Sequence, residues 1–159
     1  MSLLDKEAVK RAGKALKDFD PSLRIIVLDK SARTTKDAAS SLNCEEGAIV
    51  KSLLFRTEDY FVLSLIAGDK RCSLNKLKKL INKKDIAMAN PDEVKTQTGY
   101  TIGGVSPVGH LNSVKILIDN SLERFNDLYA AAGHPNCVFK IDFINLQEIT
   151  NGEIEELIE

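Results

Sequence analysis

The chain has 159 residues, of which 43% are hydrophobic and 28% are charged, and its net charge at pH 7 is −1. This composition is typical of a folded domain with a real core, and it excludes a disordered chain. The charge also excludes a protein that coats nucleic acid over its whole surface, but it allows a local basic patch.

The sequence gives no sign of a membrane segment, a disulfide framework or a metal site. No apolar run approaches the roughly 20 residues that span a bilayer, and the charged N-terminus is unlike a signal peptide. Cys44, Cys72 and Cys137 are odd in number and widely spaced, which predicts reduced thiols and a cytoplasmic protein. His110 and His134 lie far apart with no Cys-x-x-Cys motif, so we expect neither a metal nor a cofactor.

The first part of the chain alternates helices and strands up to a clear hairpin. Apolar residues at near-helical spacing predict an amphipathic helix over 2–17, and a β-branched run predicts a strand over 23–28. A short helix is expected over 34–42. Two apolar runs at 48–56 and 60–67 then flank a polar turn, which predicts a β-hairpin.

The second part of the chain continues this irregular mixture. The expected elements are a helix over 74–82, a strand over 86–89, a helix between Asn90 and Gly99, strands over 114–118, 128–132 and 136–141, and a helix over 143–150. An acidic tail ends the chain. This order predicts one α+β domain over 1–159 with a mixed, largely antiparallel sheet.

Lys51 is unusual for its place in the hairpin. Alternation along the strand puts it on one face with Ile49, Leu53 and Phe55, which are core-type side chains. An unpaired buried ammonium is too costly to keep, so Lys51 either extends to the rim or points into a pocket. The strand alone leaves both possibilities open.

A glycine-rich segment, Thr-Ile-Gly-Gly-Val-Ser-Pro-Val-Gly-His, occupies positions 101–110. Gly103 and Gly104 permit positive φ angles and close approach of other groups, and Pro107 stiffens the segment. A rigid loop of this kind can direct successive N–H groups at a carbonyl oxygen or an oxyanion. The alternative is a tight connection between two elements.

Basic residues are concentrated in the segment 70–84, which contains no acidic residue. They are Lys70, Arg71, Lys76, Lys78, Lys79, Lys83 and Lys84. One interpretation is a solvated helix face. The other is a patch that binds an RNA backbone with strong salt dependence and little sequence preference.

Three features together point to a known family. They are a lysine in an apolar strand within Gly-Ala-Ile-Val-Lys-Ser-Leu at 47–53, the loop Gly-Gly-Val-Ser-Pro-Val-Gly at 103–109, and Ala-Ala-Gly-His-Pro-Asn at 131–136. The chain thereby resembles the YbaK/ProX family of aminoacyl-tRNA deacylases over about residues 20–158. These proteins are relatives of the editing domain of bacterial prolyl-tRNA synthetase. The resemblance implies a strongly bent sheet surrounded by helices, and hydrolysis of the ester that joins a wrong amino acid to tRNA.

The resemblance also implies roles for particular residues. Lys51 matches a lysine at the pocket mouth, and it either binds a phosphate or ribose of the terminal adenosine or acts as a general base; we prefer binding. His134 matches a histidine of members that act on alanyl-tRNA, and it either orients water or braces its loop. The remaining candidates are Gly103 and Gly104 for the oxyanion, and Val105, Ser106, Pro107 and Gly133 for substrate binding.

The expected partner is the acceptor end of a tRNA, with a synthetase as a second partner to consider and neither DNA nor membrane. Lys76, Lys79 and Lys83 are the candidate tRNA contacts. The expected substrate is a small amino acid such as alanine, cysteine or serine, and the Gly-His-Pro turn favours alanine or a broader small-residue range.

Two alternatives remain. One is a non-catalytic module that binds tRNA or a synthetase, which a Lys51 pointing away from the Gly103–Pro107 loop would favour. The other is a hydrolase of a free small ester, which would need no basic patch.

Overall fold

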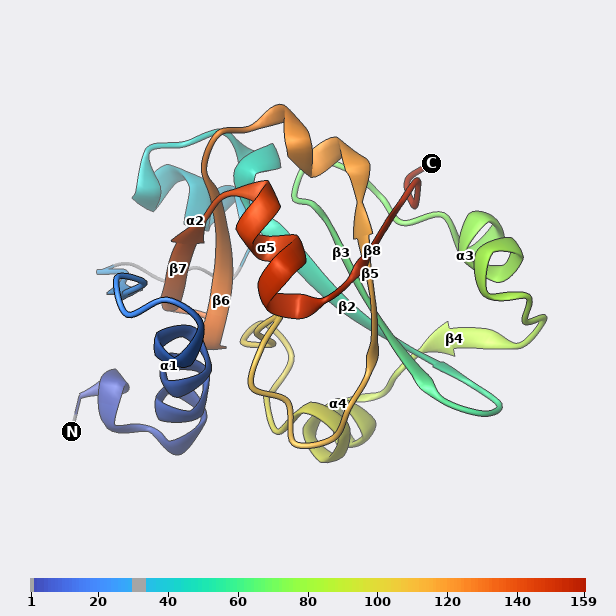
Figure 1. The fold of residues 1–159 in the computed structure, drawn as a ribbon, viewed down its shortest axis with the longest axis horizontal. Helices are drawn as coiled ribbons and strands as arrows, with labels where there is room; N and C mark the ends of the chain where they lie inside the picture. Colours follow the sequence, from blue (N-terminus) through green and yellow to red (C-terminus); the bar gives the residue numbers. More distant parts are fainter. Residues whose placement is uncertain (1, 30–33) are drawn as a thin grey trace.

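The computed structural model describes residues 2–29 and 34–159, which form two β-sheets flanked by helices (Figure 1). The larger sheet has the order β4–β2–β3–β5–β8, and the smaller has the order β1–β7–β6. The strands of the larger sheet are β4 (Ile86–Met88), β2 (Val50–Thr57), β3 (Phe61–Ala67), β5 (Lys115–Asp119) and β8 (Glu153–Glu155). Those of the smaller sheet are β1 (Ile25–Val27), β7 (Cys137–Ile141) and β6 (Leu128–His134).

The pairing of the strands confirms an α+β fold with mixed sheets. The expected β2–β3 hairpin is antiparallel, and so are the β2–β4, β1–β7 and β6–β7 pairs. The β3–β5 and β5–β8 pairs are parallel. A single parallel bridge between Ile49 and Tyr129 connects the two sheets, where the sequence had suggested one sheet.

The described residues contain five α-helices, which lie around the sheets, and most of them begin at a side-chain cap. They are α1 (Glu7–Phe19), α2 (Thr35–Leu42), α3 (Leu74–Ile81), α4 (Pro91–Thr98) and α5 (Phe143–Thr150). Short 3₁₀ turns occupy Leu3–Asp5, Glu46–Ala48 and Asn120–Arg124. Thr34, Ser73 and Asp142 each cap a helix through one backbone N–H, and Asn90 forms a full capping box with Glu93.

Two elements differ from the sequence prediction. The helix expected over 2–17 starts at Glu7, because Lys6 is extended and separates it from a 3₁₀ turn. The acidic tail contains β8, which was not predicted because the three residues Glu-Ile-Glu are too short a run to establish strand alternation. This strand forms because β5 offers it a free edge.

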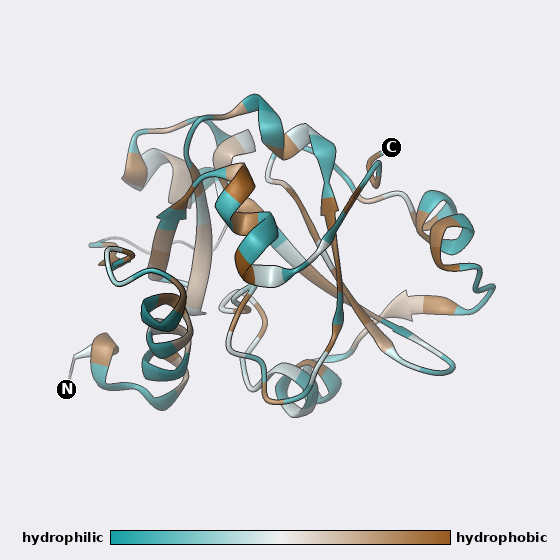
Figure 2. Cartoon of the chain, viewed as in Figure 1, coloured by the Kyte–Doolittle hydropathy of each residue, from teal (hydrophilic) through white to brown (hydrophobic). Residues whose placement is uncertain are grey.

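The core lies on both sides of the β2–β3 hairpin. Leu54 and Leu63 pack into the largest cluster, which also contains α1 and the inner face of the smaller sheet. Phe55 packs on the opposite face with Leu77 of α3. Figure 2 shows apolar residues concentrated in these strands and hydrophilic residues on α1. Among the described residues, no helix is long and apolar enough to cross a membrane.

Candidate active site

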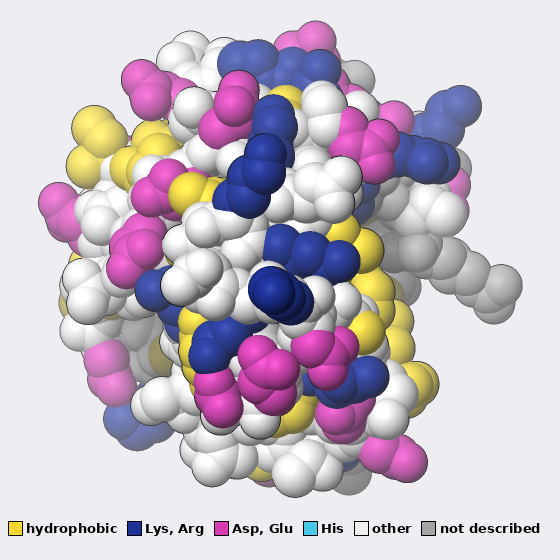
Figure 3. Space-filling view, turned by 90° about the vertical axis from the view of Figure 1, so that its right-hand side faces the viewer, with side chains coloured by type: hydrophobic (Ala, Val, Ile, Leu, Met, Phe, Trp, Pro, Cys, Tyr) yellow, Lys and Arg dark blue, Asp and Glu magenta, His cyan; other side chains and the backbone are white. Residues whose placement is uncertain are grey.

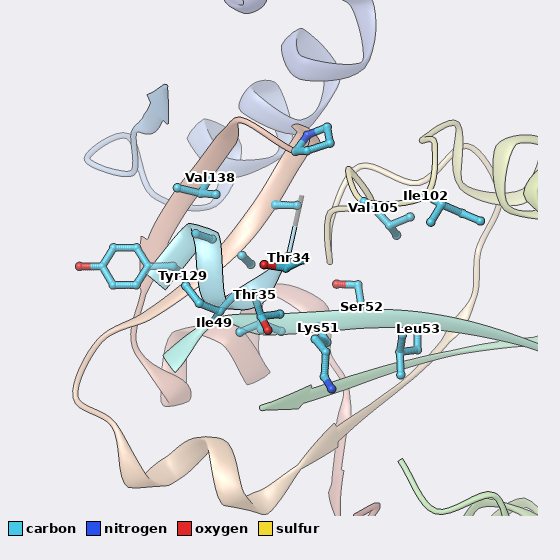
Figure 4. Close-up of a pocket in the computed structure, with 16 residues that line it drawn as sticks. Thr34, Thr35, Ile49, Lys51, Ser52, Leu53, Ile102, Val105, Tyr129 and Val138 are labelled. Atoms are coloured by element: carbon cyan, nitrogen blue, oxygen red, sulfur yellow. The ribbon is translucent and has the colours of Figure 1, made fainter. Parts of the chain in front are cut away.

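A cavity of about 370 Å³ opens between the two sheets (Figure 4). Its wall comes from parts of four segments, at 34–38, 49–53, 102–105 and 129–138. Strand β2, the start of α2, the glycine-rich loop and the β6–β7 hairpin therefore all contribute to one site. The volume is within the range typical of small-molecule sites.

The glycine-rich loop and the β6–β7 turn are held against each other beside this cavity. The N–H of Gly133 donates to the carbonyl of Gly104 over 3.0 Å. A Cβ on Gly104 would lie 3.0 Å from both Cα and N of His134, so only glycine fits without a shift. Two motifs that are distant in the sequence thus form one rigid wall.

The outer part of this loop lines the cavity and carries backbone donors that have no acceptor in the described chain. Gly103 and Val105 both line it, and Gly103 has a φ of +90°, which favours glycine. The N–H of Gly104 donates to the Thr101 carbonyl over 2.9 Å. The N–H groups of Gly103 and Val105 have no protein acceptor within residues 2–29 and 34–159. The loop therefore has two backbone donors to offer a ligand.

Ser106 and Pro107 lie behind this wall and do not line the cavity. Both are buried. The Ser106 hydroxyl accepts from the Val108 N–H over 3.4 Å, and its carbonyl is 2.7 Å from Nε2 of His110. In this structure the two residues stabilise the loop that carries Gly103 and Val105, whereas the sequence had suggested contact with substrate.

Lys51 is among the lining residues, but its ammonium leaves the cavity. The group donates to the carbonyl of Lys70, and Figure 4 shows it pointing away from Val105 and Ile102. Burial lowers the pKa of Lys51, while the nearby Glu46 carboxylate acts in the opposite direction. Lys51 therefore shares the α3 side of β2 with Phe55, as strand alternation requires.

Ser52 occupies the other face of β2 and was missed in the sequence. Its Oγ is buried and has no hydrogen-bond partner among the described groups, and the residue lines the cavity. Figure 4 shows it on the side of the strand that faces Val105. The available signal was a hydroxyl in an apolar strand, directly after the anomalous lysine.

His134 closes the β6–β7 hairpin and is not part of the cavity wall. Its Nδ1 accepts from the Asn136 N–H over 3.0 Å, which places any ring proton of the neutral form on Nε2. Burial, and secondarily the Lys6 ammonium, lower the pKa of His134. These contacts match the bracing role more closely than the water-orienting one. Gly133 before it has a φ of +95° and lies against the backbone of Ala8.

Comparison with known proteins identifies this arrangement. Residues 29–149 match the family model of the aminoacyl-tRNA editing domain. The chain belongs to this family. The editing domain is 32% identical over 127 residues to the uncharacterized protein YwhH of Bacillus subtilis (strain 168), covering 79% of this chain and 80% of that protein.

Two further similar proteins have names that refer to prolyl-tRNA synthetase. Proline–tRNA ligase of Thermosipho melanesiensis is 29% identical over 139 residues, which are 87% of this chain but only 24% of the ligase. The crystal structure of a candidate trans-editing enzyme for prolyl tRNA synthetase superposes with a TM-score of 0.92 at 34% identity, covering 97% and 98% of the two chains. The resemblance to the YbaK-type family is therefore confirmed, together with its fold.

The basic segment of the editing domain is partly neutralised by acidic neighbours. Lys76 lies 3.3 Å from a Glu156 carboxylate oxygen and donates to the Ile158 carbonyl, and Lys83 pairs with Asp59. Lys79 has no ion pair within the described chain. Figure 3 shows basic side chains on the α3 side of the molecule with acidic ones close beside them. The structure therefore offers a mixed surface here, and of the three candidate contacts Lys79 is the exposed one without an ion pair in the described chain.

The cavity wall also contains no carboxylate among the described residues. Elsewhere in the described chain, no group of three His, Cys, Asp or Glu side chains is arranged to hold a metal ion. Chemistry drawn from this wall would rest on backbone N–H groups, hydroxyls and a bound water.

Proposed function

We propose that this editing domain acts in trans as a hydrolase that removes a wrongly attached small amino acid from tRNA, without a metal or cofactor. The observation that carries the proposal is the cavity between the sheets, where the Gly103 and Val105 N–H groups are available on a wall braced by Gly133. The family match supports the editing chemistry.

The reaction demands little covalent work from the protein. A water attacks the carbonyl carbon of the aminoacyl ester, and the carbonyl oxygen becomes an oxyanion. The bond to the ribose oxygen then breaks, and that oxygen receives the proton that the attacking water gave up. Donors fixed in advance stabilise the oxyanion most effectively, and the paired loops would fix the donors of Gly103 and Val105 in this way.

Specificity would come from the size of the cavity. Ala38, Ala130 and Ala131 line it with short side chains, beside the larger Ile49 and Val138. A synthetase gains only about 1–3 kcal/mol from one methylene, so a second site that admits small residues is a physical route to accuracy. Alanine, cysteine and serine are the proposed substrates.

Lys51 has a proposed role in binding the terminal nucleotide at the mouth of the cavity. Its stem already lines the site, and a flexible four-carbon chain would let the ammonium exchange the Lys70 carbonyl for a phosphate. A lowered pKa is also compatible with a general base. The observed direction of the ammonium favours the second candidate function, a non-catalytic module that binds tRNA or a synthetase.

One experiment separates these functions. The wild type, Lys51→Ala and the control Lys95→Ala, which alters an exposed lysine of α4, are compared on tRNAs charged with alanine, serine, threonine, cysteine or proline. We expect rapid release of one small amino acid, lost only in Lys51→Ala. Binding of tRNA without hydrolysis above the rate in buffer would instead establish the module.

The same assay tests the hydrolase of free esters. A variant with alanine at Lys76, Lys79 and Lys83 is compared with the wild type on charged tRNA and on the methyl ester of the same amino acid. We expect the variant to lose activity on charged tRNA and to keep its activity on the methyl ester. Equal rates on both substrates in both proteins would favour the free-ester hydrolase.

A further inference from the structure

Ser52 has a buried hydroxyl that nothing in the described chain satisfies. Its Oγ has no hydrogen-bond partner, although almost all buried polar groups in native proteins have one. Its neighbours on the same face of β2 are Val50 and Leu54, and Leu65 lies opposite on β3, so its surroundings within the sheet are apolar. The missing partner must therefore come from the cavity.

The threonine hydroxyls of the cavity wall already take part in hydrogen bonds, and the tyrosine hydroxyl is turned away. The Thr34 hydroxyl accepts from the Asp37 N–H and caps α2, and Thr35 donates to Glu46 over 2.6 Å. Figure 4 shows the Tyr129 hydroxyl pointing away from Ser52. Ser52 is thus the buried hydroxyl of this wall that has no hydrogen bond among the described residues.

Small movements suffice to present this hydroxyl to a ligand. Serine occupies staggered side-chain positions, and one step of about 120° exchanges Oγ with a hydrogen of Cβ. Because Ser52 lines the cavity, this rotation needs no movement of the strand. A hydroxyl donates one hydrogen bond and accepts two, so Oγ can accept a hydrogen bond from a donor group of the ligand.

We propose that Ser52 accepts a hydrogen bond from the α-ammonium of the aminoacyl ester, and this inference rests on the function proposed above. The ammonium of a bound aminoacyl group needs an acceptor, and no carboxylate is present among the described residues of the wall. The Lys51 ammonium lies on the opposite face of β2 and leaves this position to the substrate. Ser52 is therefore a positioning residue that turns the ester toward Gly103 and Val105.

Ser64 provides a matched control on the neighbouring strand. Its Oγ is also buried without a partner in the described chain, but it faces the opposite side of the hairpin and does not line the cavity. Ser52→Ala and Ser64→Ala delete the same atom from similar apolar surroundings. Neither deletion removes a hydrogen bond of the unliganded protein, so we expect neither to lower the melting temperature.

The test uses two substrates that differ only at the α-position. These are alanyl-tRNA and propionyl-tRNA, in which hydrogen replaces the ammonium. We expect Ser52→Ala to lower kcat/KM on alanyl-tRNA by about 10- to 100-fold, the loss typical of a hydrogen bond to a charged group. On propionyl-tRNA it should stay within about twofold of the wild type, Ser52→Thr should retain activity, and Ser64→Ala should match the wild type on both substrates.

The outcomes are distinguishable from failure of the proposed function. Equal losses on the two substrates, or no loss on either, would overturn the role of Ser52 while leaving the hydrolase intact. If no charged tRNA is hydrolysed, binding of the alanyl amide of 3′-amino-3′-deoxyadenosine decides the matter by calorimetry. Weaker binding by Ser52→Ala alone supports the inference. Equal binding by the wild type and both variants refutes it, and so does the absence of detectable binding by all three proteins.

Discussion

Replacing Gly104 by alanine should disrupt the contact between the glycine-rich loop and the β6–β7 turn. The new Cβ would lie 3.0 Å from Cα and N of His134 and 3.1 Å from the carbonyl carbon of Gly133. Carbon atoms prefer a separation of about 3.5–4.0 Å, so the loop must retreat by about half an ångström. All three opposing atoms belong to the backbone, and a side-chain rotation therefore cannot relieve the overlap.

The size of the effect follows from two losses. The Gly133–Gly104 hydrogen bond of 3.0 Å would stretch to about 3.5 Å, beyond the usual limit. Losing it costs about 1 kcal/mol, and overpacking adds about 1–2 kcal/mol. For a chain of this length, about 2–3 kcal/mol corresponds to a fall of about 4–12 °C in the melting temperature.

The assay is thermal unfolding monitored by circular dichroism, followed by deacylation at a temperature where the variant is fully folded. We expect slower deacylation even where the variant is fully folded, because the displaced loop carries Gly103 and Val105 at the cavity. Gly13→Ala is the control, since its Cβ meets only the tip of Ile25 at 3.2 Å and alanine is favoured inside α1. A melting temperature of Gly104→Ala within about 1 °C of the wild type would refute the reasoning.

Three further predictions concern stability, pH and tRNA binding. Arg11→Met should lower the free energy of unfolding by about 2–4 kcal/mol in urea titrations, because Arg11 donates to the Gly109 and Thr98 carbonyls over 2.7 and 3.3 Å. The control is Lys10→Met, which replaces an exposed residue of the same helix. Burial lowers the pKa of His110, so the unfolded chain binds a proton first as pH falls below about 6.5. The free energy of unfolding, measured at pH 7.5 and at pH 5.5, should therefore be lower at pH 5.5. The difference between the two values should be smaller in His110→Gln. Lys79→Ala should reduce the salt dependence of tRNA binding by about one counterion in fluorescence titrations, whereas Lys76→Ala, already paired with Glu156, should change it less.

The sequence was most informative where local patterns repeat. The hairpin of β2 and β3 and the capped starts of α2, α3 and α4 were predicted because alternation, turn residues and capping residues agree there. The strand β8 is too short to show such a pattern and exists because of a long-range partner, β5. The division into two sheets, which the Ile49–Tyr129 bridge joins, likewise depends on long-range pairing that no local rule describes.

The site was harder to predict because β2 is buried on both faces. Alternation correctly grouped Lys51 with Phe55 on one face of the strand. The sequence of an apolar strand that is covered on both faces, however, does not indicate which face lines a cavity. Proximity of Gly104 to Gly133 was also beyond local reasoning, because the two residues belong to motifs that are far apart in the sequence.

The geometry of β2 assigns different tasks to two consecutive residues. Because adjacent side chains of a strand point to opposite faces, Ser52 and Lys51 cannot both project into the same cavity from an undistorted strand. Ser52 faces the interior, where a small ligand group would be desolvated, and the Lys51 ammonium lies on the other face of the strand against the Lys70 carbonyl. A lysine in that position suits a phosphate that approaches from outside, since a point charge on a flexible stem tolerates imprecise placement. A neutral hydroxyl suits the interior, because it can pair with an ammonium without leaving a buried charge when the cavity is empty.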